Sequence, residues 1–104
     1  MKNRLVVSLA AALALAILVP SAVQAVGVGK TCGGFPGFQC DAGLFCQKKP
    51  GHCFVMDVSG TCAKTPKFCP HYVRPVCGCD GKTYNNDCER QKAMISKNRD
   101  GKCG

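Results

Sequence analysis

The sequence predicts a small disulfide-rich α+β fold, and three observations support this class. The chain has only 104 residues but ten cysteines, a content typical of exported domains that are held together by cross-links. Its aromatic residues are five Phe and two Tyr, so the hydrophobic core is too small to stabilise the fold alone. A hairpin signal at Asp80-Gly81 is followed at once by a helix start. We therefore expect up to five disulfides and no free thiol.

Residues 1–25 have the pattern of a secretory signal peptide. Lys2 and Arg4 precede an apolar run over residues 5–19, and Val23-Gln24-Ala25 offers small residues for cleavage. The run is shorter than the roughly 20 apolar residues of a spanning helix. We therefore expect cleavage after Ala25, no membrane contact by the mature chain, and a secreted or periplasmic location.

The cysteine spacing favours disulfides over zinc ligation or redox chemistry. The chain has no Cys-x-x-Cys pair, and only Cys77 and Cys79 lie close together. We expect no metal site and no cofactor. An enzyme is not expected either, because His52 and His71 are the only histidines and neither G-x-S-x-G nor H-E-x-x-H occurs. Basic residues are scattered rather than clustered, so the sequence predicts no nucleic-acid partner.

The mature chain divides into a leader and two cysteine-rich parts. Residues 26–31 form the leader, and residues 32–61 hold four cysteines among Gly and Pro residues that mark turns. In this part we expect a hairpin whose strands, 44–46 and 52–54, are joined by a turn at 48–51. Residues 62–104 form the second part.

The second part should contain a hairpin centred on Asp80-Gly81. Both residue types tolerate the positive backbone angles of a two-residue turn. Residues 76–77 and 82–84 would be its strands.

A short helix should follow this hairpin. Asn86 or Asp87 can accept hydrogen bonds from its first free amides, and Glu89 in its first turn complements the helix dipole. We expect the helix over residues 87–94, and then a turn at 98–101.

The segment from residue 69 to residue 88, CPHYVRPVCGCDGKTYNNDC, carries the most specific pattern in the chain. Seven residues separate Cys69 from Cys77, six separate Cys77 from Tyr84, and three separate Tyr84 from Cys88. With this spacing, residues 62–104 resemble the Kazal-type serine protease inhibitor family. The resemblance implies a Kazal fold, in which a short helix packs on a small antiparallel sheet.

One cysteine departs from the usual Kazal pattern. In most members two or three residues separate the cysteine matching Cys88 from a further cysteine, but here the corresponding positions hold Gln91 and Lys92. Cys79, in the CGCDGKTY hairpin, restores the count and resembles the pattern of bacterial Kazal-like domains.

The resemblance also implies the disulfide pairing. Family pairing joins Cys69 to Cys88 and Cys77 to Cys103, which leaves Cys62 for Cys79. The preceding part, with its Cys-x-x-Gly-x-x-Cys at residues 40–46, resembles the amino-terminal subdomain of follistatin-type modules. That likeness implies two further bridges, Cys32 with Cys46 and Cys40 with Cys53.

In the Kazal family the loop after the second cysteine enters the protease. The resemblance places His71 in the primary specificity pocket, with His71-Tyr72 as the reactive bond, and implies that Asn86 bridges to the loop backbone while Tyr84 packs beneath it. Asn86 could instead only cap the helix, and Tyr84 could only fill the core. The whole reactive loop comprises Pro70, His71, Tyr72, Val73 and Arg74.

The function that this resemblance implies is inhibition of a serine endopeptidase by a secreted monomer. Pro70 fixes its own backbone angle, and Pro75 biases Arg74 toward an extended form, so both ends of the loop are stiffened. His71 is neither the strongly basic residue that suits trypsin-like pockets nor the large apolar residue that suits chymotrypsin-like or subtilisin-like pockets. The target protease therefore stays open. Subtilisin-like and chymotrypsin-like enzymes are the most plausible partners.

Two other functions stay open. The disulfide scaffold could carry a loop that inhibits nothing, because a fold alone does not determine function. Alternatively, the chain could be a non-inhibitory follistatin-like extracellular binding module that contacts polyanions through its basic surface. The basic residues available for this are Lys48, Lys49, Lys64, Lys67, Arg90, Lys92, Lys97, Arg99 and Lys102.

Overall fold

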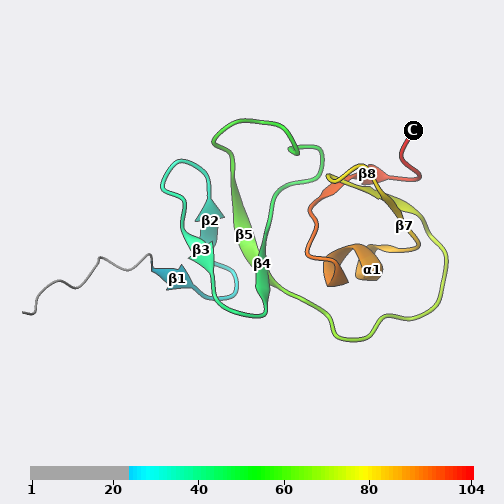
Figure 1. Ribbon diagram of the computed structural model, residues 1–104, viewed down its shortest axis with the longest axis horizontal. Coiled ribbons are helices and arrows are strands. Elements are labelled where there is room, and N and C mark those ends of the chain that lie inside the picture. The colour runs from blue at the N-terminus through cyan, green and yellow to red at the C-terminus, as the bar shows by residue number, and fades with distance from the viewer. Residues whose placement is uncertain (1–23) are drawn as a thin grey trace, which may run out of the picture.

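The computed structural model describes residues 24–104, so the expected signal sequence lies almost entirely outside the described residues. Two three-stranded sheets, each from a different half of the chain, lie side by side (Figure 1). The one helix among the described residues is short and accompanies the second of these sheets. Within the described residues, no helix has the length and apolar character needed to cross a bilayer. The small disulfide-rich α+β class is confirmed.

The first sheet has three antiparallel strands in the order β2-β5-β4. These are β2 (Thr31–Gly33), β4 (Leu44–Gln47) and β5 (Ser59–Lys64). Gly60 allows the central strand to approach β4 closely, because a Cβ on Gly60 would lie 2.6 Å from the Gln47 carbonyl oxygen. Beside this sheet, β1 (Ala25–Val26) pairs in parallel with β3 (Gln39–Cys40).

The hairpin expected between residues 44–46 and 52–54 is wrong, although the first of these strands exists as β4. Its partner is β5, and residues 52–54 are in no strand. The connecting segment turns instead toward the second half of the chain. There the Lys48 amide donates to Ser96 Oγ at 2.9 Å, and the Gly51 amide donates to the Lys97 carbonyl at 3.1 Å.

The second sheet has β6 at its centre, in the order β7-β6-β8. Its strands are β6 (Val76–Gly78), β7 (Thr83–Tyr84) and β8 (Lys97–Asp100). The turn expected at 98–101 is therefore wrong, because residues 97–100 pair with the open edge of β6 and only Gly101, at φ 87°, turns the chain.

The hairpin predicted around Asp80-Gly81 forms, but its turn is longer than two residues. Cys77 pairs with Thr83, and the Gly81 amide donates to the Gly78 carbonyl at 3.0 Å. Among the turn residues only Gly81 has a positive φ, of 81°. The Asp80 carboxylate accepts from the Lys82 amide instead, which closes the turn from its side chain.

The predicted helix start is confirmed, and the helix is shorter than expected. α1 (Asp87–Lys92) is capped by Asn86, whose side chain accepts from the Glu89 amide. It ends at Lys92 with Ala93 as the C-cap, because Met94 adopts a φ of 62° that cannot continue a right-handed helix.

All ten cysteines are paired, and none is free. Three bridges agree with the expected pairing and two do not. The expected Cys40–Cys53 and Cys62–Cys79 bridges are wrong: Cys40 pairs with Cys62, and Cys53 pairs with Cys79. The bridges that agree are Cys32–Cys46, Cys69–Cys88 and Cys77–Cys103.

The position of Cys62 in strand β5 explains why Cys62 pairs with Cys40 and leaves Cys53 for Cys79. Cys62 lies opposite Cys46 on this central strand, and the sulfur atoms of Cys32, Cys40 and Cys62 lie within 4.8 Å of one another. Cys62 is thereby fixed in the first sheet. The expected boundary between residues 61 and 62 falls inside β5. This strand therefore contains residues from both of the expected parts.

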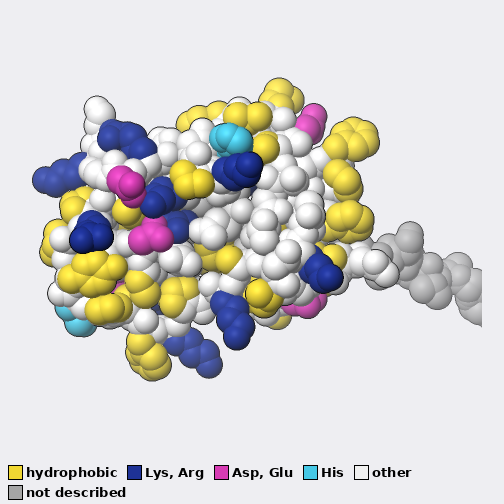
Figure 2. All heavy atoms as spheres, turned by 180° about the vertical axis from the view of Figure 1, so that it is seen from behind, with side chains coloured by type: hydrophobic (Ala, Val, Ile, Leu, Met, Phe, Trp, Pro, Cys, Tyr) yellow, Lys and Arg dark blue, Asp and Glu magenta, His cyan; other side chains and the backbone are white. Residues whose placement is uncertain are grey.

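The core is as small as the composition predicts. The buried apolar residues are Phe45, Val76 and three half-cystines, and many larger apolar side chains stay on the surface. Figure 2 shows hydrophobic side chains spread over one face, with Lys and Arg between them. Disulfides therefore supply stability that apolar burial in so short a chain does not.

Candidate functional site

Residues 70–74 form an exposed loop between Cys69 and strand β6. All five side chains are exposed, and they include Tyr72 at 46% and Val73 at 75% exposure. Phe68, just before Cys69, is 88% exposed. Apolar and aromatic side chains thus project from the same stretch that contains His71, although burial would favour them inside.

Asn86 attaches this loop to the start of α1. Its Nδ2 donates to the Pro70 carbonyl at 3.2 Å and to the Tyr72 carbonyl at 2.8 Å. Those two carbonyls flank His71 in sequence, so the two bonds hold the backbone on both sides of that residue. The other side-chain atom of Asn86, Oδ1, accepts from the Glu89 amide at 3.0 Å. Asn86 is itself 1% exposed, and all its polar side-chain atoms have partners.

Further bonds hold both ends of the loop. The Cys69–Cys88 bridge ties its start to α1. At its end, the Arg74 amide donates to the Asn85 carbonyl at 2.7 Å, and buried Val76 begins β6 directly after Pro75. The sequence did not single out Asn85, because its contact is made by the backbone carbonyl, which every residue type has.

Tyr84 lies in β7 of the hairpin. Its hydroxyl donates to the Asp80 carboxylate, and its ring packs so near Gly78 that a Cβ there would lie 2.9 Å from Tyr84 Cε2. Burial, the hydrogen bond to Asp80 and the negative charge of Asp80 together raise the pKa of Tyr84 to about 12. Tyr84 pairs with Val76, which directly follows Pro75 at the end of the loop.

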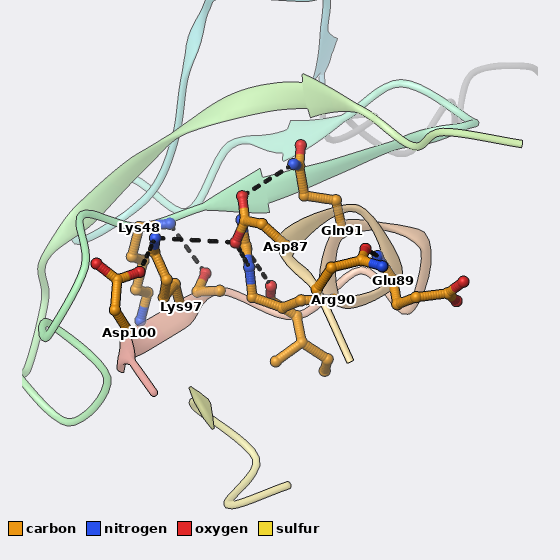
Figure 3. A network of polar contacts seen from close by, with 10 residues as sticks. Lys48, Asp87, Glu89, Arg90, Gln91, Lys97 and Asp100 are labelled. Atoms are coloured by element: carbon orange, nitrogen blue, oxygen red, sulfur yellow. Dashed lines mark hydrogen bonds and ion pairs between the residues drawn. The ribbon is translucent and has the colours of Figure 1, made fainter. Parts of the chain in front are cut away.

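A partly buried ion pair joins Arg90 to Asp87, the residue after Asn86 (Figure 3). Arg90 is 2% exposed, and its Nε and Nη2 both donate to the Asp87 carboxylate, at 2.8 and 3.0 Å. Arg90 Nη1 donates to the Ile95 carbonyl. The hydrogen bonds from Arg90 hold the pKa of Asp87 below its usual range, although partial burial opposes this. Sequence analysis grouped Arg90 with the exposed cations and missed this role, although Asp87 and Arg90 have the i,i+3 spacing of a helical pair.

The arrangement presents a short, anchored stretch of backbone with its side chains directed to solvent. Within the described residues, the loop and its supports contain no nucleophile paired with a base. An exposed stretch of backbone that is already held in place suits binding as a peptide ligand.

Comparisons with known proteins identify this region. A model of the Kazal-type serine protease inhibitor domain matches residues 46–103, which is more than half of the chain. The chain is also 45% identical over 49 residues to ovomucoid of Coturnix delegorguei, covering 40% of this chain and 94% of that protein. It is 39% identical over 57 residues to serine protease inhibitor Kazal-type 12 of Mus musculus, covering 48% of this chain and 66% of that protein.

A longer relative matches in part. The chain is 36% identical over 69 residues to ovoinhibitor of Gallus gallus, a match that covers 51% of this chain and 13% of that protein. The matched region contains the exposed loop, Asn86, the helix and the second sheet. The chain therefore belongs to the Kazal-type serine protease inhibitor family, whose members are protease inhibitors and not enzymes.

Proposed function

We propose that this protein is a secreted inhibitor of serine endopeptidases that presents residues 70–74 to the protease as a substrate would. The observation that carries the proposal is the pair of hydrogen bonds from Asn86 to the carbonyls of Pro70 and Tyr72. A free peptide loses about 0.5–1.5 kcal/mol for each side chain immobilised on binding. A loop that is already held by its backbone avoids most of this cost.

His71 would fill the primary specificity pocket, and the His71-Tyr72 bond would lie at the protease nucleophile. The two bonds from Asn86 fall on either side of this position, which leaves the His71 side chain free to project. Cleavage would not release the inhibitor. The Cys69–Cys88 bridge would hold the new end at His71, and the hydrogen bond from the Arg74 amide to the Asn85 carbonyl would hold the new end at Tyr72. The two ends would stay close enough to rejoin.

The side chains around His71 favour an apolar protease cleft. Phe68, Tyr72 and Val73 are all exposed, and Arg74 is the only charged residue of the loop. Subtilisin-like and chymotrypsin-like enzymes, which accept extended apolar stretches, are therefore the proposed partners. The inhibitor would act as a monomer, because a single loop provides the whole contact.

The test is a set of inhibition constants for the refolded protein against trypsin-like, chymotrypsin-like, elastase-like and subtilisin-like enzymes. His71→Leu should strengthen inhibition of the chymotrypsin-like and subtilisin-like enzymes by about tenfold or more, because an apolar side chain fills an apolar pocket better. His71→Arg should shift inhibition toward the trypsin-like enzyme, whose pocket favours a basic side chain.

Met56 provides matched controls, because it is 86% exposed and lies in the connection between β4 and β5. Met56→Leu and Met56→Arg make similar side-chain changes away from the loop and should leave all four constants unchanged. If neither His71 substitution creates or shifts inhibition in folded protein, the loop does not bind proteases. The non-inhibitory follistatin-like binding module would then be the better account.

A further inference from the structure

A basic cavity of about 350 Å³ lies between the first sheet, with the segment after β4, and the second sheet with its helix. Residues 47–50 and Thr61, from the first sheet and the segment after β4, line one side. Asp87, Arg90 and Lys97, from α1 and β8, line the other. A ligand bound here would contact both halves at once, on a surface distinct from residues 70–74.

The only carboxylate in the cavity wall is already satisfied. Asp87 accepts from Arg90 Nε and Nη2, accepts from Gln91 Nε2 at 3.1 Å, and lies 3.9 Å from Lys97 Nζ. Both its oxygen atoms therefore have partners (Figure 3). Nothing in this arrangement leaves a free acceptor for the remaining cations of the wall.

Two of the four cations in the wall have no ionic partner. Arg90 is paired with Asp87, and Lys97 with Asp87 and, at 2.8 Å, with Asp100. Lys48 and Lys49 form no ion pair among residues 24–104. The cavity thus has excess positive charge, carried by half-buried Lys48 and exposed Lys49.

We propose that this cavity binds a tetrahedral oxyanion carried on a sugar-sized molecule, as a sulfate or phosphate monoester. Lysine ammonium groups bind such oxyanions as point charges, and Lys48 and Lys49 are the free ones. A volume of about 350 Å³ exceeds the need of a bare ion and falls in the lower range of small-molecule sites. The proposal does not depend on the inhibitory function of the loop.

The experiment is calorimetric titration of the folded, fully disulfide-bonded protein with inorganic sulfate, inorganic phosphate, glucose 6-phosphate and glucose 6-sulfate, with unmodified glucose as the neutral control. At least one of the two sugar esters should bind more tightly than the corresponding inorganic ion, and glucose should not bind. Comparing glucose 6-phosphate with glucose 6-sulfate distinguishes phosphate from sulfate esters. Binding should weaken as sodium chloride is raised, because the attraction is ionic.

A double variant locates the site. Lys48→Gln combined with Lys49→Gln should weaken binding by about tenfold or more, because two charge-assisted contacts are lost. Lys67→Gln combined with Lys102→Gln removes the same charge outside the cavity and should weaken binding less than about twofold. Equal effects of the two double variants, or no binding of either ester at millimolar concentration, would overturn the proposal.

Discussion

Asn86 is the residue on which both the exposed loop and the helix depend. Its two side-chain ends do different work: the amide nitrogen holds the loop through Pro70 and Tyr72, and the amide oxygen caps α1. The two roles considered from the sequence, bridge and cap, are therefore not alternatives. The carboxamide of Asn or Gln carries two donor hydrogens on its nitrogen and a separate acceptor oxygen, and Gln is one methylene longer.

Two substitutions at this position separate the roles. Asn86→Ala removes the loop bonds and the cap, whereas Asn86→Ser retains a good cap on a side chain too short to reach both carbonyls. If the loop is inhibitory, both variants should inhibit about thirtyfold more weakly, since two hydrogen bonds contribute about 2 kcal/mol together. Ala should lower the free energy of unfolding by about 1 kcal/mol more than Ser.

Inhibition constants and urea unfolding curves measure the two effects. Unchanged inhibition by folded Asn86→Ser would show that the bonds to the loop are dispensable. Equal unfolding free energies of the two variants would show instead that the cap contributes nothing.

At the scale of elements, the sequence predicted what local chemistry determines. The β6–β7 hairpin follows from Asp80-Gly81, and the start of α1 follows from its capping residue. Strands β5 and β8 were missed because their existence depends on distant partners. Gly60 shows no strand preference, yet the absence of a Cβ is what permits β5 to lie against Gln47.

The same distinction holds for the site. The spacing of the cysteines carries the resemblance that implies the loop and the bridge from Asn86, and residue type indicates Asn86 or Asp87 as the helix cap. The burial of Arg90 and the cavity lined by Lys48 require strands and helix to be assembled first. Long-range packing, not residue type, produces both features.

The β6–β7 hairpin should show a characteristic response to alkali. Its Tyr84 hydroxyl donates to Asp80, and the pKa of Tyr84 is raised from 10.0 to about 12. A raised folded-state pKa means that the folded protein favours the protonated hydroxyl. The resulting stability is fully present below pH 10 and is lost as the pH rises from about 10 to about 12.

Absorbance of the phenolate measures this pKa directly in Tyr72→Phe, where Tyr84 is the only tyrosine left. The folded variant should titrate near 12, and adding Asp80→Asn should lower the midpoint, because the negative charge beside the hydroxyl is gone. A midpoint near 10 in folded Tyr72→Phe would contradict the hydrogen bond to Asp80.

At the scale of the whole molecule, disulfides connect parts that share little apolar core. Cys53–Cys79 joins the connection between β4 and β5 to the hairpin of the second sheet, whereas Cys40–Cys62 lies within the first half. Sequence reasoning exchanged these partners because Cys53 and Cys62 flank the same turn-rich stretch, and only the pairing of β5 decides which half each one joins.

Removing the bridge between the halves should therefore lower stability without disabling the loop. The Cys53→Ala, Cys79→Ala double variant loses a link of sequence separation 26, which contributes about 3–4 kcal/mol in the chain-entropy model. The loop keeps Cys69–Cys88, Cys77–Cys103 and Asn86, so the inhibition constant should change less than about threefold while the unfolding midpoint in urea falls. In contrast, Cys69→Ala with Cys88→Ala removes a link of similar separation, 19, and should abolish inhibition at a comparable loss of stability. Equal losses of inhibition in two folded double variants would mean that the junction between the halves, and not the loop's own anchors, holds the inhibitory conformation.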